Sequence, residues 1–265
     1  MADFFRLNRR VFLAHLGKGT LAMAVFAACE NSAEIPSTSA GGTSPSTTPA
    51  TTAGTTNPGT SAAPASTAAP GARFERVNLG FVSAYIVARG SEAAIVDTGV
   101  SGSESGIEAA LGEAGLGWEH VGHVILTHRH PDHVGSAPAV LEAASGATGY
   151  AGEGDLASIT SPRALTPLAD GSTVFGLDVV GTPGHTAGHI CLLDSSAGVL
   201  VAGDALVGAE GGVVGPNPQF SSDHDEALRS VEKLASLAYE HILFGHGEPV
   251  SSGGSTLVAD LAAGL

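Results

Sequence analysis

A stretch of low-complexity sequence limits which part of this chain can fold into a compact domain. Between residues 37 and 72, every residue except Asn57 is Ser, Thr, Pro, Ala or Gly. Such a stretch holds too little apolar surface to offset the conformational entropy lost on folding. We therefore expect residues 30–72 to form a disordered linker, and the hydrophobic core to come from a single domain of residues 73–265.

The residues before this linker resemble an export signal. Basic residues between positions 6 and 18 precede an apolar stretch at 21–28, which is far shorter than the ~20 residues that span a bilayer. The sequence RRVFL at 9–13 resembles the twin-arginine signature. We interpret residues 1–29 as a twin-arginine-type signal peptide that directs the protein out of the cytoplasm.

A cysteine closes this signal. Residues 26–29, FAAC, resemble a lipobox, in which the cysteine is acylated after cleavage, although Phe26 stands where leucine is usual. The resemblance predicts a lipoprotein of the cell envelope, anchored through Cys29 to the outer side of the cytoplasmic membrane. The alternative is an ordinary signal peptide in which Cys29 has no role.

The balance of charge argues against a nucleic-acid partner. The chain has 11 Lys and Arg against 26 Asp and Glu, a formal net charge of −15. Nucleic acids are bound largely by Lys and Arg, which neutralise phosphates and release counterions. We expect a small-molecule substrate instead. Cys29 and Cys191 are too few for a disulfide framework or a Cys-rich zinc site, so a bound metal would need histidine and oxygen ligands.

The pattern of apolar residues in 73–265 predicts two batches of strands, each followed by helices. Helices are expected at 103–115, with Ser103 as the cap, at 131–144, at 221–241 and near the C-terminus. Strands are expected at 74–79, 81–88, 92–99, 123–127, 172–184, 189–194, 198–204 and 241–247. This order predicts the α/β class, as a four-layer α/β/β/α sandwich with the two sheets face to face.

The sequence THRHPDH at 127–133 places three histidines and an aspartate at the end of an apolar strand. His128 and His130 are two residues apart in extended chain, so their side chains point the same way. Asp132 and His133 follow where a helix starts. Four candidate metal ligands therefore meet at one strand-to-helix corner.

Three further candidates lie at strand ends or in glycine-rich turns. His185 lies in GTPGHTAGH, Asp204 ends VLVAGD, and His246 stands between two glycines in FGHG. Sites in layered α/β folds are built from such loops. Asp97, in IVDTG, is also consistent with simple turn chemistry. A single histidine at a strand end is more often structural, so His120, His123, His224 and His241 are left unassigned.

Taken together, these motifs resemble the metallo-β-lactamase superfamily, which is marked by H-x-H-x-D-H. The likeness covers about residues 73–250 and includes, in order, IVDTG, THRHPDHVG, GTPGHTAGH, VAGD and FGHG. It implies that His128, His130 and His185 hold one zinc ion. It also implies that Asp132, His133 and His246 hold a second, that Asp204 bridges the two, and that Asp97 orients ligands.

Such a centre implies a dinuclear metal-dependent hydrolase with two Zn²⁺ per chain. Zinc lowers the pKa of a bound water to about 7, so a metal-bound hydroxide can attack a small ester, thioester, lactone or amide. Asp132 is the expected catalytic residue, which orients the nucleophile and protonates the leaving group. Iron or manganese would fit the same ligands. The alternatives are a mononuclear iron oxidoreductase of the persulfide dioxygenase type and a β-lactamase.

The loops around the site narrow the substrate only in part. Zinc β-lactamases carry cysteine or lack an acid where Asp204 stands, and quorum-quenching lactonases carry tyrosine where Val207 stands. The glycine-rich loops at 99–105 and 207–220 are expected to shape the pocket, the second as a substrate flap. Arg129 and Arg163 are the candidate cations near the site.

Overall fold

The first sheet of the domain is built in chain order. In the computed structural model, the described residues are 71–210 and 212–265, so the predicted signal peptide, Cys29 and most of the linker lie outside them. The six strands pair as β1-β2-β3-β4-β5-β6, antiparallel from β1 to β3 and parallel from β3 to β6. Their bounds are Arg73–Asn78, Ser83–Arg89, Glu92–Val96, Val121–Leu126, Thr148–Gly152 and Thr166–Leu168.

The second sheet comes from the C-terminal half and has the order β13-β10-β9-β8-β7. Only β10 and β13 run parallel, and the other neighbours are antiparallel. Its strands, in chain order, are β7 at Thr173–Val174, β8 at Leu177–Gly181, β9 at Ile190–Asp194, β10 at Val199–Val201 and β13 at His241–Leu243. A separate hairpin consists of β11 at Val207–Ala209 and β12 at Gly212–Val214.

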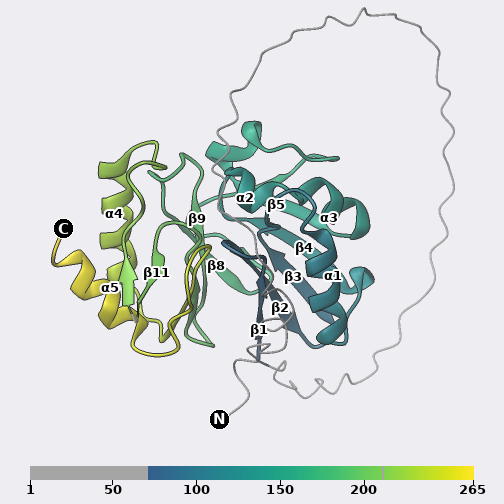
Figure 1. Cartoon of the computed structure of the whole chain (residues 1–265), viewed down its shortest axis with the longest axis horizontal. Coiled ribbons are helices and arrows are strands. Elements are labelled where there is room, and N and C mark those ends of the chain that lie inside the picture. The colour runs from purple at the N-terminus through teal and green to yellow at the C-terminus, as the bar shows by residue number, and fades with distance from the viewer. Residues whose placement is uncertain (1–70, 211) are drawn as a thin grey trace, which may run out of the picture. The chain divides into compact units, whose positions relative to one another are not determined.

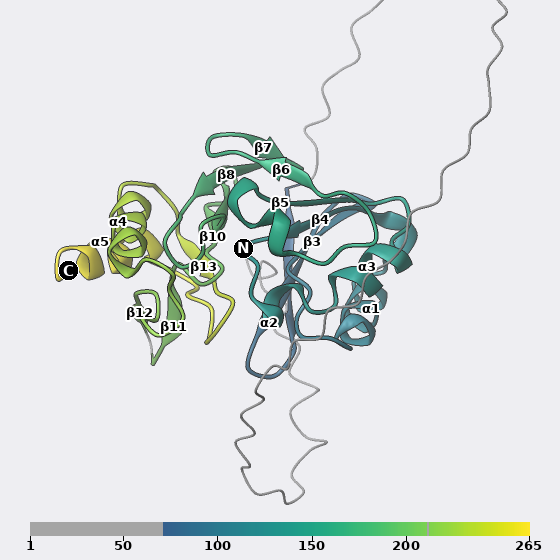
Figure 2. The same ribbon diagram turned by 90° about the horizontal axis from the view of Figure 1, so that it is seen from above.

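Helices cover the outer face of each sheet, as Figures 1 and 2 show. The first sheet carries α1 and α3, and the second carries α4 and α5, whereas the short α2 follows the end of β4. Their bounds are Glu104–Glu113, Pro131–Val134, Ala137–Ala143, His224–Ala235 and Gly254–Ala262, with short 3-10 segments η2 at Trp118–His120 and η3 at Glu153–Ser158. No helix among the described residues combines the length and apolar character needed to cross a bilayer.

Alternating side chains on the central strands fill three separate apolar layers. In β2, Ala84 and Ile86 pack toward α1 and α3, whereas Tyr85 and Val87 pack between the sheets. In β9, Leu192 lies between the sheets, whereas Cys191 packs toward α4. A strand buried on both faces reads as a nearly continuous apolar run. The predicted α/β/β/α sandwich is confirmed.

Hydrogen bonds also join the two sheets directly, at the edge where the metal-ligand candidates lie. Ile190 N donates to Thr127 O at 2.9 Å, and Ser83 N donates to Gly245 O at 2.8 Å. The buried Tyr85 hydroxyl donates to Phe244 O at 2.7 Å. These bonds fix the end of β4 against the start of β9 and the end of β13.

The single helix predicted at 131–144 is wrong, because it divides into α2 and α3. Pro138 lacks the amide hydrogen that a continuous helix would need there. Between the two helices, the Ser136 hydroxyl donates to Val100 O at 2.7 Å and accepts from Ser103 N at 2.8 Å. Ser103 caps α1 by position, but its own side chain makes no capping bond.

Two other expectations need correction. Helix α4 ends at Ala235, six residues before the predicted end, and Asp223 caps its start by accepting from Glu226 N at 2.9 Å. The glycine-rich segment 207–220 was expected to be a loop, but its first half forms the β11–β12 hairpin. Short strands with several glycines carry too weak an alternation to be recognised in sequence.

Asp194, at the end of β9, ties this sheet to the first and is almost fully buried. Arg89 donates to its Oδ2 at 2.5 Å, and Ser196 N and Ala197 N donate to its Oδ1 at 3.0 and 2.9 Å. Burial alone would raise the pKa of this carboxyl group. The bonds from Ser196, Ala197 and Arg89 outweigh burial and hold the pKa below its usual value.

We expect Asp194→Asn to lower the free energy of unfolding by about 1–3 kcal/mol at neutral pH, because buried donors lose their acceptor. Since the folded-state pKa is depressed, the contribution is complete above the unfolded-state pKa of about 3.9 and is lost as the pH falls through the folded-state value. Urea unfolding of both proteins at stepwise lower pH measures this. A difference that does not shrink in acid would contradict the assignment.

Candidate metal centre

Four of the predicted ligands lie where β4 ends and α2 begins. The chain stays extended through His130, whose φ and ψ are −65° and 143°, and Pro131 takes the first helical position. His128 and His133 are fully buried, whereas His130 and Asp132 are partly exposed. Nε2 of His128 and Nδ1 of His130 lie 3.1 Å apart, so these two side chains converge, as the spacing predicted.

The other three ligands come from the second sheet. His185 lies in the turn between β8 and β9, Asp204 follows β10, and His246 follows β13. Because β10 and β13 are parallel neighbours, their carboxyl ends lie at the same edge of the sheet. The structure brings all seven predicted residues together in two groups.

The first group contains His128, His130, His185 and Asp204. Nδ1 of His130 lies 3.1 Å from Nε2 of His128 and 2.9 Å from Nε2 of His185. Oδ2 of Asp204 lies 3.5 Å from Nε2 of His185 and 3.9 Å from Nε2 of His128. One ligand atom from each residue lies within 4.8 Å of the others.

The second group contains Asp132, His133 and His246, and Asp204 contacts it as well. Nε2 of His246 lies 3.1 Å from Oδ2 of Asp132 and 3.4 Å from Oδ2 of Asp204. Nε2 of His133 lies 3.2 Å from Oδ1 of Asp204. The Asp204 carboxylate therefore stands between the two groups, at the position that a bridging ligand would occupy.

The candidate ligand atoms cannot all be satisfied by hydrogen bonds to one another, whereas bound cations would satisfy them. Oδ1 of Asp204 is buried and accepts no hydrogen bond from any described residue. Nδ1 of His130 faces two imidazole nitrogens, yet one ring nitrogen cannot satisfy both with a single proton. Five imidazoles and two carboxylates are the ligand types that suit Zn²⁺, iron or manganese. The residues present therefore fit a two-metal site.

The histidine pKa values shift in opposite directions in the two groups. Burial lowers the pKa of His128, and it lowers the pKa of His185 to about 4, so both imidazoles are neutral with a lone pair free to bind. Burial also opposes protonation of His133, but Asp204 and Asp97 outweigh it and hold that pKa well above its usual value. Hydrogen bonds to Asp132 and Asp204 raise the pKa of His246 to about 10. A cation entering the second group would displace these protons.

Two hydrogen bonds fix the rings of the second group. Asp97 follows β3 with φ of 60°, a conformation uncommon for a non-glycine residue, and accepts from Thr127 N at 2.7 Å. Its Oδ2 lies 2.8 Å from Nδ1 of His133. The carbonyl of Phe81 lies 2.7 Å from Nδ1 of His246. In both rings, a proton on Nδ1 leaves Nε2 directed at the site.

His189 lies beside this site although it is outside the set of predicted ligands. It is buried, and its Nε2 accepts from Asp204 N at 3.0 Å. Its Nδ1 lies 2.8 Å from the Thr182 hydroxyl, which contacts the buried Cys191 thiol at 3.3 Å. Burial lowers the pKa of His189 to about 3, so the ring is neutral and can accept. The repeated histidine in GHTAGH was the available signal.

The two arginines predicted near the site have different roles. Arg163 donates to three backbone carbonyls around the end of α3, those of Leu141, Ala144 and Ala147, and therefore serves to cap that helix. Arg129 remains beside the site, but its guanidinium is paired with Asp155, a residue that sequence reasoning missed.

The fold and this arrangement of side chains define a metal-binding protein with two groups of candidate ligands. Residues 77–246 match the family model of the metallo-beta-lactamase superfamily, and the chain belongs to that superfamily. The uncharacterized protein YobT of Bacillus subtilis is 31% identical over 197 residues, which cover 63% of this chain and 83% of YobT.

The chain is also similar to a curated hydrolase and to a solved structure of the superfamily. A hydroxyacylglutathione hydrolase of Rhizobium etli is 34% identical over 161 residues, covering 58% of this chain but only 59% of the hydrolase. The crystal structure of TTHA1623 in a di-iron-bound form superposes with a TM-score of 0.57 at 26% identity, covering 69% of this chain and 95% of TTHA1623.

We expect His189→Ala to destabilise the metal-free protein by about 1–3 kcal/mol, because the buried Asp204 amide loses its acceptor. His189→Gln keeps an oxygen at a similar reach and should recover much of this loss. Denaturant unfolding in the presence of a chelator measures both. Equal destabilisation by the two substitutions would show that the hydrogen bond to Asp204 is not the cause.

Proposed function

We propose that this protein is a dinuclear metal-dependent hydrolase of small ester, thioester, lactone or amide substrates. The observation that carries the proposal is the position of Asp204, whose carboxylate contacts both ligand groups. Bound metal ions would supply Lewis-acid chemistry, in which they polarise a substrate oxygen and lower the pKa of a water molecule. The names of the hydrolase relatives support hydrolysis, but the chain spans too little of them to transfer a substrate.

The residues of this chain would divide the remaining work. His128, His130 and His185 would hold one ion and Asp132, His133 and His246 the other. Asp132 is partly exposed, and its Oδ2 lies 3.1 Å from Nε2 of His246. We assign to it the positioning of the attacking water and the return of a proton to the leaving group.

Zinc is the proposed metal, since neutral imidazoles and carboxylates are its usual ligands in catalytic sites. Iron and manganese suit the same ligand atoms, and TTHA1623, a structural relative, binds two iron ions, which makes iron the alternative metal. Two complete groups of ligands favour this reading over a mononuclear iron oxidoreductase. An aspartate at position 204 favours it over a β-lactamase.

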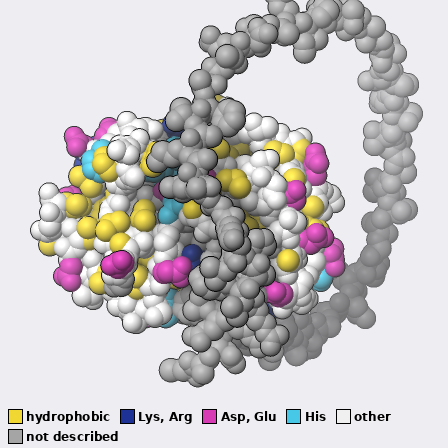
Figure 3. All heavy atoms as spheres, viewed as in Figure 1, with side chains coloured by type: hydrophobic (Ala, Val, Ile, Leu, Met, Phe, Trp, Pro, Cys, Tyr) yellow, Lys and Arg dark blue, Asp and Glu magenta, His cyan; other side chains and the backbone are white. Residues whose placement is uncertain are grey.

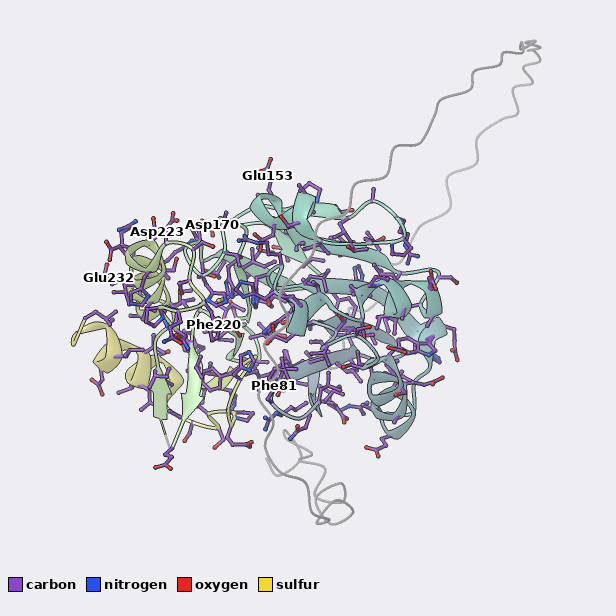
Figure 4. All side chains as sticks on the ribbon, turned by 45° about the horizontal axis from the view of Figure 1, so that its top comes forward. Phe81, Glu153, Asp170, Phe220, Asp223 and Glu232 are labelled. Carbon is purple, nitrogen blue, oxygen red and sulfur yellow. The ribbon has the colours of Figure 1, made fainter. Side chains whose placement is uncertain are left out.

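Two exposed aromatic residues beside the candidate ligands favour an apolar, uncharged substrate group. Phe81 and Phe220, labelled in Figure 4, are 66% and 64% exposed. The Phe81 and His246 rings are stacked, with their centroids 6.0 Å apart. Phe220 precedes Ser221, whose hydroxyl oxygen lies 3.4 Å from Nδ1 of His185. The two aromatic residues thus adjoin ligands of different groups. Asp and Glu are scattered over the face in Figure 3, where few Lys or Arg are seen.

The purified full chain should contain two metal ions, measured by elemental analysis, and should hydrolyse members of a panel of acyl esters, thioesters, lactones, amides and β-lactams. His130→Ala should lose metal and turnover, whereas Asp132→Asn should lower kcat by about 10²–10⁴-fold. His120→Ala makes the same change at a histidine outside the site and should keep both metals. One iron per chain with oxygen uptake would refute the proposal.

We also propose that the protein is exported and anchored in the cell envelope through a lipid on Cys29. The support is the sequence alone: the twin-arginine-like signal, the lipobox-like residues 26–29 and the linker that follows them. A tether of this composition would let residues 73–265 act at a distance from the membrane surface.

Cys29→Ala should release the protein from the membrane fraction and abolish incorporation of a labelled fatty acid. Replacement of Arg9 and Arg10 by Lys should instead leave the precursor in the cytoplasm, so the two variants separate export from lipid attachment. An unlabelled, freely soluble exported wild-type protein would show that Cys29 is not acylated.

A further inference from the structure

A buried carboxylate outside the ligand set links two of the ligand-bearing loops. Asp155 lies in η3, after β5, and its side chain is completely buried. Among the described residues, its hydrogen-bond partners are Arg129, Thr186 and Gly188, none of which is a candidate ligand. Its two oxygens instead accept four hydrogen bonds from residues of the loops that carry His128, His130 and His185.

Two of these bonds come from the loop after β4, and two come from the turn between β8 and β9. Arg129, between His128 and His130, donates from its backbone N at 2.9 Å and from Nη1 at 3.0 Å. On the loop that carries His185, the Thr186 hydroxyl donates at 2.5 Å and Gly188 N at 3.0 Å. One carboxylate therefore joins loops that follow β4 of the first sheet and β8 of the second.

The backbone around Asp155 is packed so closely that the distance between the loops is fixed. A Cβ on Gly188 would lie 2.3 Å from Asp155 N, and a Cβ on Gly152 would lie 2.0 Å from Gly188 O. Both positions require glycine because no side-chain atom fits. The contact extends through Arg129, whose Nη2 donates to the Ser222 hydroxyl at 3.3 Å, while Ser222 N donates to His185 O at 3.0 Å.

We propose that Asp155 is a positioning residue for the first metal site, which holds the His128–His130 pair at the correct distance from His185. Aspartate suits this role because its four acceptor positions match two amides, a hydroxyl and a guanidinium, which also balances its charge. Within the described part of the chain, the polar partners of Asp132, His133 and His246 do not include it. The effect should therefore be confined to one metal.

The inference rests on the proposed two-metal site but not on hydrolysis, and it is tested by metal affinity. Apo protein of the full chain is titrated with Zn²⁺ against a chromophoric chelator. Asp155→Asn replaces one acceptor oxygen by an NH2 group that faces two donors, and it should weaken binding at the first site at least tenfold, within the range of about 10–100-fold known for residues that orient ligands. Glu153→Gln, in the same segment but exposed in Figure 4, is the matched control and should bind normally.

Two background variants identify which metal is affected. With His246→Ala, the first group remains, and Asp155→Asn should still weaken its metal. With His185→Ala, the first group is incomplete, and Asp155→Asn should change the remaining affinity less than threefold. Should Asp155→Asn fail to fold, Arg129→Met removes only the side-chain bonds and should give a smaller loss at the same site.

Other outcomes separate the possible failures. A wild-type chain that binds fewer than two ions contradicts the proposed function itself. A wild type with two ions and an Asp155→Asn variant that merely melts earlier, with both affinities intact, would show a purely structural role and overturn the inference. Equal weakening of both sites would overturn it as well.

Discussion

The carboxylate of Asp204 is the contact on which the rest of the site depends. It lies at the end of β10, nearly buried, between imidazoles that arrive from both sheets. Burial would raise its pKa, but the nearby imidazoles of His133 and His246 outweigh burial and hold the pKa well below its usual value. A buried anion with one oxygen lacking a hydrogen bond is costly unless cations compensate it. The surrounding histidines therefore make sense as a metal-binding shell around this group.

Much of this site could be predicted because its ligands stand at strand ends that apolar runs make visible. HVILT and VLVAG are buried strands, so the polar residues directly after them had to emerge at a sheet edge. The pairing of the sheets also followed from two batches of strands separated by helices. The structure brings the seven residues together, and their assignment as ligands remains a prediction.

What sequence could not provide is the set of contacts that hold the ligands in place. Asp155 lies 25 residues after His130 in a short 3-10 segment whose sequence has no periodic apolar pattern. The residues beside it in sequence do not predict the four hydrogen bonds that it accepts. The break between α2 and α3 was missed for a related reason. Pro138 is tolerated in the first turn of a helix, so it does not distinguish one helix from two unless the packing of Ser136 is known.

The division of ligands between the sheets has a consequence for the stability of the whole domain. The corner after β4 supplies four donors, and the second sheet supplies three, so neither half can form the centre by itself. Ions held there would cross-link the halves and would be bound only by the assembled state. At a free concentration 1,000 times the dissociation constant, a single such ion adds about 4 kcal/mol to the free energy of unfolding. Scarcity of metal would thus threaten the persistence of the native domain as well as its chemistry.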